Sequence, residues 1–166
     1  MLKIGVGPST SHTVGPWRAA ERFLSELRAE KIVPKVTRIK VDLYGSLSLT
    51  GKGHATDLAI MLGLSGQDPE YIPVQNIAGI VETIKSKKEI ILGNEINIPF
   101  DFLNDIIFNK NFLPFHANGL TFTAFLSDDK EYQSSFYSIG GGFVVKEERV
   151  NAKKILEINI NGLESS

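Results

Sequence analysis

Three histidines are the residues of this chain best suited to proton transfer near neutral pH, and each lies in a stretch rich in glycine. His12 lies in a segment of Gly, Ser and Thr, His54 follows residues 50–53 (TGKG), and His116 precedes residues 117–119 (ANG). Imidazole has an ordinary pKa close to neutrality, so it can accept and release a proton there. Each signal is weak alone. Together the three predict one convergent polar site.

The segment before the first expected helix has the features of an anion site. The first turn of a helix offers N–H groups without an intrahelical acceptor, and its dipole favours negative charge. Ser9, Thr10 and Ser11 add hydroxyl donors. A carboxylate or phosphate could bind there, although Ser11 or Thr13 could equally serve only as a helix cap, the commoner role of such residues.

The other two histidine segments also have two interpretations. Lys52 could bind a carboxylate and His54 could transfer a proton, or the segment is a glycine-rich turn with a solvated lysine; it lacks the Walker A spacing. Asn118 could contact a substrate while His116 shuttles a proton or orients a group, or Asn-Gly is only the turn before a strand. The nearby phenylalanines, among them Phe112 and Phe115, are expected in the core.

The elements that must position these segments follow from hydrophobic periodicity. Apolar residues at three- and four-residue spacing predict helices from Pro16 to about Leu27, from His54 to about Leu64, and over 76–87, with a loop over 44–53. Alternation predicts strands over 36–43, 89–92, 95–99, 120–126, 131–139 and 143–145, with a turn at 128–129. Helices come early and strands late, so we expect an α+β fold: a mixed, largely antiparallel sheet with helices packed on one face.

Composition limits the partners. The 166 residues carry 18 Lys and Arg against 19 Asp and Glu, which gives no electrostatic reason to expect nucleic acid. No apolar run is long enough to span a bilayer and the N-terminus lacks a secretory pattern, so we expect a cytoplasmic protein without a membrane partner. Cysteine is absent, which excludes thiolate ligation by this chain, and we predict no metal ligands in it.

Longer motifs resemble a known family. The segments 5–16 (GVGPSTSHTVGP), 44–57 (YGSLSLTGKGHATD) and 137–143 (YSIGGGF), with the His-x-Asn-Gly of 116–119, closely resemble the iron–sulfur L-serine dehydratases in order and spacing. The likeness runs from Lys3 to about Val145. Within the family this domain is similar to the allosteric substrate-binding domain of some phosphoglycerate dehydrogenases.

The resemblance implies the conversion of L-serine to pyruvate and ammonia, with a [4Fe–4S] cluster acting as a Lewis acid on the substrate hydroxyl while a protein base removes the α-proton. It makes His54 the first candidate for the base and His12 and His116 the other catalytic candidates. Substrate binding would fall to the residues with hydroxyl, ammonium or amide groups: Ser9, Thr10, Ser11, Lys52 and Asn118.

The family's cluster is bound by cysteines in a separate C-terminal domain, which this chain lacks. We therefore expect residues 1–145 to form a beta-chain-like domain that is inactive alone, and 146–166 to be a linker with some helix toward a cluster-binding domain. A homo-oligomer is also expected. Two other hypotheses stay open: a regulatory module that binds a small carboxylate, and an interface domain whose glycine-rich loops only pack against a neighbour.

Overall fold

The computed structural model describes residues 12–51, 55–150 and 153–159, and its centre is a six-stranded sheet in the order β4-β1-β5-β6-β7-β8. The strands are β1 (Val36–Leu43), β4 (Ile106–Phe108), β5 (Gly119–Leu126), β6 (Glu131–Gly140), β7 (Phe143–Val150) and β8 (Lys153–Asn159). Only β1 and β4 pair in parallel among these; the other neighbours are antiparallel. A separate hairpin joins β2 (Glu89–Leu92) to β3 (Ile96–Pro99).

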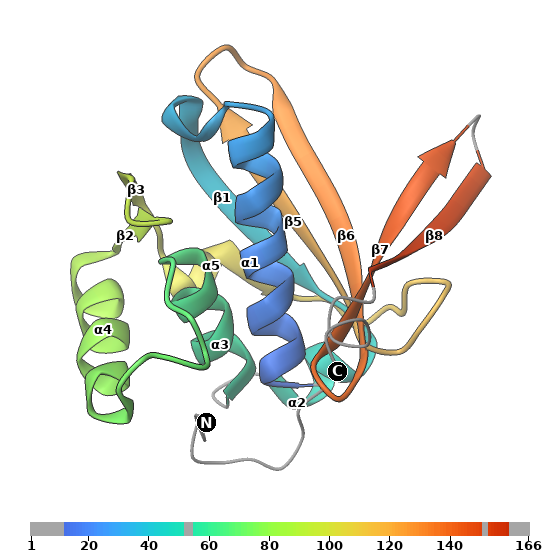
Figure 1. Ribbon diagram of the computed structural model, residues 1–166, viewed down its shortest axis with the longest axis horizontal. Coiled ribbons are helices and arrows are strands. Elements are labelled where there is room, and N and C mark those ends of the chain that lie inside the picture. Colours follow the sequence, from blue (N-terminus) through green and yellow to red (C-terminus); the bar gives the residue numbers. More distant parts are fainter. Residues whose placement is uncertain (1–11, 52–54, 151–152, 160–166) are drawn as a thin grey trace.

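The helices lie on one side of this sheet (Figure 1). They are α1 (Val14–Ala29), α2 (Gly45–Gly51), α3 (Ala55–Leu64), α4 (Val74–Lys87) and the short α5 (Phe102–Asp105), with a 3₁₀ turn at Val33–Lys35. The long helix α1 crosses the sheet over β5, β6 and β7, α3 packs on α1, and α4 lies beyond α3. The predicted α+β class, with a mixed and largely antiparallel sheet, is confirmed.

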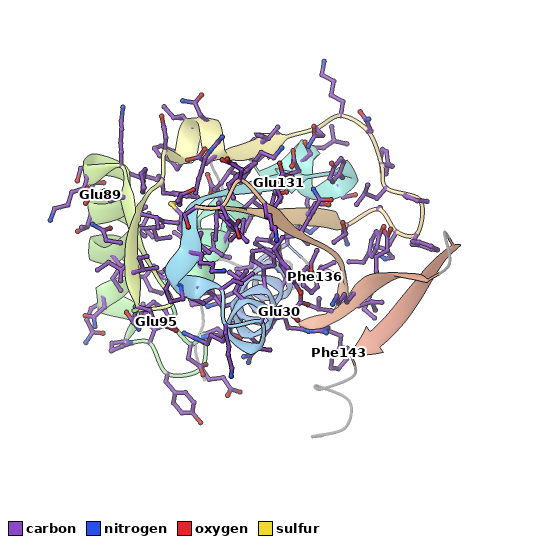
Figure 2. The ribbon with its side chains drawn as sticks, turned by 90° about the horizontal axis from the view of Figure 1, so that it is seen from above. Glu30, Glu89, Glu95, Glu131, Phe136 and Phe143 are labelled. Atoms are coloured by element: carbon purple, nitrogen blue, oxygen red, sulfur yellow. The ribbon has the colours of Figure 1, made fainter. Side chains whose placement is uncertain are left out.

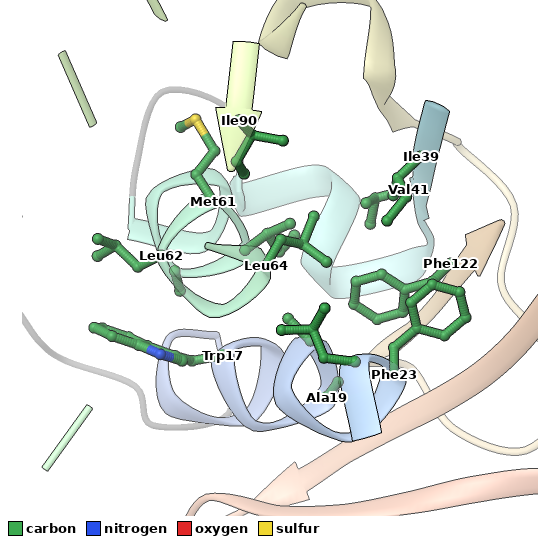
Figure 3. Close-up of a cluster of buried hydrophobic side chains, with 14 of the residues drawn as sticks. Trp17, Ala19, Phe23, Ile39, Val41, Met61, Leu62, Leu64, Ile90 and Phe122 are labelled. Carbon is green, nitrogen blue, oxygen red and sulfur yellow. The ribbon is translucent and has the colours of Figure 1, made fainter. Parts of the chain in front are cut away.

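The core is built where α1 meets both the sheet and α3. Trp17 and Phe23 on α1 are completely buried, and the Phe23 ring stacks on Phe122 of β5 with 5.1 Å between ring centroids. On the other side of α1, residues of α3 such as Leu62 face the same cluster (Figure 3). Phe136 of β6 lies beside α1 when the molecule is seen from above (Figure 2). The apolar stripe recognised in the sequence of α1 is thus buried on two sides.

Two local predictions were wrong. Residues 45–51 form α2 where a loop was expected, because tertiary contacts compensate for a glycine- and serine-rich sequence: Leu47 is fully buried and the Ser46 amide donates to the Ala117 carbonyl at 2.8 Å. The tail was expected to contain some helix, but β7 continues to Val150 and pairs with β8. The role of residues 146–166 as a linker stays a prediction. No helix in the described part of the chain is long and apolar enough to cross a membrane.

The close approach of α1 and α3 gives a stability prediction. A Cβ on Gly63 would lie 2.6 Å from the Ala20 Cβ and 2.8 Å from the Trp17 carbonyl oxygen. Gly63→Ala should therefore lower the free energy of unfolding, measured by urea denaturation, by about 1–3 kcal/mol through overpacking. Gly79→Ala is the matched control, because its Cβ meets nothing within 4 Å on α4, and it should raise stability by about 0.5–1 kcal/mol. If Gly63→Ala and Gly79→Ala changed the free energy of unfolding equally, the close contact between α1 and α3 would be contradicted.

Candidate functional site

The candidate site residues divide into two groups. His12, His116 and Asn118 lie within the described structure, and all three are partly buried. The remaining candidates lie outside the described residues: Ser9, Thr10, Ser11, Lys52 and His54. The described neighbours of these segments nevertheless show which parts of the chain meet.

The histidine segment before α1 contacts the start of α3. The Thr56 hydroxyl, on a residue only 1% exposed, donates to the His12 carbonyl oxygen at 2.6 Å. Thr56 lies two residues after His54 in the sequence. The hydrogen bond therefore joins the first motif segment to the second.

The second motif segment (44–57) contacts the third (116–119) through the start of α2. The Ser46 amide donates to the Ala117 carbonyl at 2.8 Å, and the Tyr44 amide donates to the Gly119 carbonyl at 2.9 Å. Between them, Gly45 has φ +58°, and a Cβ there would lie 2.2 Å from the Ala117 oxygen. Only glycine permits both this conformation and this approach.

The third motif segment is joined to the fourth by two hydrogen bonds between Asn118 and Ser138. The Ser138 amide donates to the Asn118 carbonyl at 2.9 Å, and the Asn118 side-chain amide donates to the Ser138 carbonyl at 3.2 Å. Both residues lie at the same end of the β5–β6 pair, where Gly119 is opposite Tyr137.

The fourth motif segment (137–143) contacts the start of α1, next to the first motif segment. Residues 140–142 form the β6–β7 turn with φ of +104°, +63° and +82°, a run that only glycines adopt without strain. A Cβ on Gly142 would lie 3.1 Å from Cγ1 of Val14, at the start of α1. We call this closed circuit of four segments the loop ring, defined by the described residues 12–14, 44–51 with 55–57, 116–119 and 137–143. It lies at one end of the sheet, where α1 and α3 begin (Figure 1).

Hydrogen bonding defines the state of the His116 imidazole within the loop ring. Nδ1 accepts a hydrogen bond from the Asn118 amide at 3.0 Å. An N–H that donates to Nδ1 requires a lone pair there, so the neutral ring carries its hydrogen on Nε2. His116 in this state can donate through Nε2 but has no free lone pair with which to act as a base.

Asn118 has one group available for a ligand. Its side-chain nitrogen donates to Ser138, but its Oδ1 is buried and has no hydrogen-bond partner in the described part of the chain. A buried acceptor without a partner costs about 1–3 kcal/mol, so such atoms in native proteins usually bind a ligand or water. An ammonium group, with three donors, would satisfy it.

Two of the phenylalanines near His116, Phe112 and Phe115, were placed incorrectly by the sequence analysis, whereas Phe122 is buried in the core as expected. Phe112 is 57% exposed and Phe115 is 40% exposed, so neither belongs to the core. Sequence reasoning also gave no individual role to Tyr137, which is fully buried beneath this turn and donates to Glu147 at 2.6 Å. An aromatic residue directly before Ser-Ile-Gly-Gly-Gly was the available signal.

The residues present do not fit an iron–sulfur cluster. The chain has no cysteine to supply thiolates. Within the described ranges, no group of three His, Cys, Asp or Glu side chains could bind a metal ion. What the loop ring does offer is amide, hydroxyl and imidazole chemistry.

Comparison with known proteins assigns the family. The sequence model of the family described as serine dehydratase beta chain matches residues 1–149. The chain belongs to the serine dehydratase beta-chain family. It is 40% identical over 163 residues to L-serine dehydratase 1 of Escherichia coli, covering 96% of this chain and 36% of that protein. It is 45% identical over 150 residues to an L-serine dehydratase of Haemophilus influenzae, covering 89% of this chain and 33% of that protein.

An L-serine dehydratase of Streptomyces coelicolor is 44% identical over 158 residues, with 94% of this chain and 35% of that protein covered. The beta-chain domain thus spans about a third of the length of these curated relatives. The family match confirms the resemblance found in the sequence. It leaves the roles of the individual site residues as predictions.

The Thr56–His12 contact gives a second stability prediction. Thr56→Val keeps the shape of the side chain but removes the hydroxyl that donates to the His12 carbonyl. We expect a loss of about 1–3 kcal/mol in the free energy of unfolding, because a buried acceptor loses its donor. Thr56→Ser keeps the hydroxyl and should recover most of the loss. A Val variant as stable as the wild type would show that the first two segments are not joined here.

The buried phenol of Tyr137 gives a prediction for alkaline pH. Burial raises the pKa of Tyr137, and the hydrogen bond to Glu147 raises it further. Because the folded-state pKa lies above the unfolded value near 10, this stabilisation is complete below about pH 10 and is lost as the pH rises through the folded-state pKa. Tyr137→Phe should reduce the slope of stability against pH above about pH 10. Urea unfolding at several alkaline pH values measures it, and an unchanged slope would contradict the assignment.

Proposed function

We propose that this chain is the non-cluster part of a cytoplasmic iron–sulfur L-serine dehydratase. It supplies substrate-binding and acid/base residues for the deamination of L-serine to pyruvate and ammonia, and it is inactive alone. The observation that carries this proposal is the loop ring, in which four sequence segments distant along the chain contact one another in a closed circuit. The family membership supports the reaction class.

The described residues support a division of labour within the loop ring. Asn118 Oδ1 is a buried acceptor suited to the ammonium group of serine. His116 Nε2–H is a donor suited to the substrate carboxylate or hydroxyl, because Nδ1 already accepts from the Asn118 amide. His116 is therefore better suited to binding than to abstraction of the α-proton. His54 stays the first candidate for the base, with His12 as the second.

The cluster and its partner are also part of the proposal. Since this chain has no cysteine, the group that the resemblance implies would be bound by another part of the enzyme, in the same chain or another. This chain leaves about two thirds of the length of the relatives uncovered. That length is enough for such a domain. The glycine-rich loop ring would then face that domain.

The first test concerns the base. The holoenzyme that contains this chain, purified without oxygen, is expected to form pyruvate from L-serine. His54→Ala should abolish pyruvate formation, since a positioned base contributes on the order of 10²–10⁴-fold, while changing the free energy of unfolding by only about 0.5 kcal/mol. Normal turnover in that variant would reject His54 as the base.

The second test concerns His116. His116→Gln places an amide donor near the position of Nε2, whereas His116→Ala removes the donor. If His116 only donates a hydrogen bond, Ala should lower kcat/KM by roughly 10²-fold and Gln should recover about tenfold of that. If instead His116 moves a proton in the reaction, Gln will be as inactive as Ala.

Two further outcomes would favour the other hypotheses. Calorimetry on the 166-residue chain that shows clear binding of L-serine or another small carboxylate, together with an active His54→Ala holoenzyme, would favour a regulatory module. Conservative replacements of the histidines that impair assembly but leave turnover per assembled enzyme unchanged would favour an interface domain.

A further inference from the structure

A buried tyrosine–glutamate pair lies directly beneath the turn that bears His116. The Tyr137 hydroxyl donates to Glu147 Oε1 at 2.6 Å, and Tyr137 is only 1% exposed. Successive side chains of a strand point to opposite faces, and the neighbouring Phe136 is on the α1 side, where the Arg22 guanidinium lies over its ring. Tyr137 therefore lies on the sheet face opposite α1. Glu147 on β7 is two residues beyond Val145, the register partner of Tyr137.

Both ends of the His116 turn rest on the Tyr137 ring. Before His116, the Phe115 ring packs edge-on against Tyr137, with 5.8 Å between centroids and 84° between planes. After it, Gly119 approaches so closely that a Cβ would lie 3.2 Å from Cε1 of Tyr137. One rigid side chain thus contacts the residues on either side of the imidazole.

We propose that Tyr137, anchored by Glu147, is the positioning residue that fixes the turn bearing His116 and thereby the direction of its Nε2–H. The hydroxyl donates to Glu147 on β7, and the ring packs edge-on against Phe115, so Tyr137 links β7 to the residue directly before His116. Tyr137 acts through His116 and makes no contact with substrate. Its catalytic consequence rests on the proposed function of His116, but the positioning itself does not.

The chemistry of the pair suits a fixed support. Burial raises the pKa of the Tyr137 phenol, and the hydrogen bond to Glu147 acts in the same direction. The phenol therefore stays protonated at neutral pH and keeps its hydrogen bond to Glu147.

The same strand provides a matched control. Tyr132, also on β6, donates its hydroxyl to Glu26 Oε1 at 3.1 Å, on the α1 side of the sheet. Its ring packs near Phe23, and within the described part of the chain it forms no hydrogen bond or ring contact with the His116 turn. Tyr132→Phe thus removes the same group, from the same strand, bonded to the same kind of acceptor. A general loss of stability should follow both substitutions, whereas a positioning effect should follow only Tyr137→Phe.

The experiment records the imidazole nitrogen signals of the 166-residue chain by nuclear magnetic resonance, which is practical because the chain has only three histidines. Wild type and Tyr132→Phe should show the His116 signals of one Nε2–H tautomer. Tyr137→Phe should shift or broaden them. In the holoenzyme, Tyr137→Phe should lower kcat/KM roughly tenfold, because the donor that His116 provides is misplaced.

The proposal is overturned if a folded Tyr137→Phe chain keeps the wild-type His116 signals, or if Tyr132→Phe changes them equally. Should Tyr137→Phe fail to fold, Glu147→Ala is the second variant: altered His116 signals support the proposal, and unaltered ones overturn it. If the holoenzyme forms no pyruvate at all, the proposed function fails, yet the imidazole signals still decide the positioning role.

Discussion

The burial of α1 on two sides is the constraint on which the other contacts depend. Its apolar residues face the sheet on one side and α3 on the other, and the contact with α3 is close enough to exclude a side chain at Gly63. Fully burying a large apolar side chain contributes about 1.5–3 kcal/mol, so several such residues fix the helix firmly. Because His12 and Val14 lie at its start, the position of α1 also determines where the loop ring closes.

A polar contact fixes the rotation of the same helix. Glu26 accepts from Tyr132 and from Ser134 and forms an ion pair with Lys146 at 3.2 Å. Apolar packing alone tolerates small rotations of a helix, whereas a partly buried carboxylate with three partners does not. Removal of one of its hydroxyl partners should cost about 1.5–3 kcal/mol, the range for a hydrogen bond to a charged group. We infer that this network specifies the arrangement of α1 on β6 and β7.

Much of the fold could be predicted from the sequence because local patterns determine it. Alternation identified β1, β5 and β6, and the spacing of apolar residues identified α1, α3 and α4. Two of the missed elements, α2 and β4, are short and depend on distant partners. Helix α2 has a sequence of low helix propensity and is stabilised by contacts with residues near Ala117, and β4 exists through its parallel pairing with β1.

The candidate site also combines features that the sequence predicts with contacts that it cannot predict. Glycine and histidine composition pointed to the segments that the loop ring joins, but no periodicity could show that Asn118 bonds Ser138 or that its amide selects one tautomer of His116. The hydrogen bond from Tyr137 to Glu147 could not be predicted for the same reason, since the two residues are on different strands. The chemical roles of the site residues remain predictions.

The closure of the loop ring by Gly142 and Val14 also has a consequence for biosynthesis. Contacts between residues so far apart in the chain form slowly, because loop-closure entropy must be overcome first. During translation, the early glycine-rich segments leave the ribosome well before the β6–β7 turn that completes the circuit. In a nascent chain the loop ring would therefore stay open until the β6–β7 turn has been synthesised and has folded back onto the start of α1.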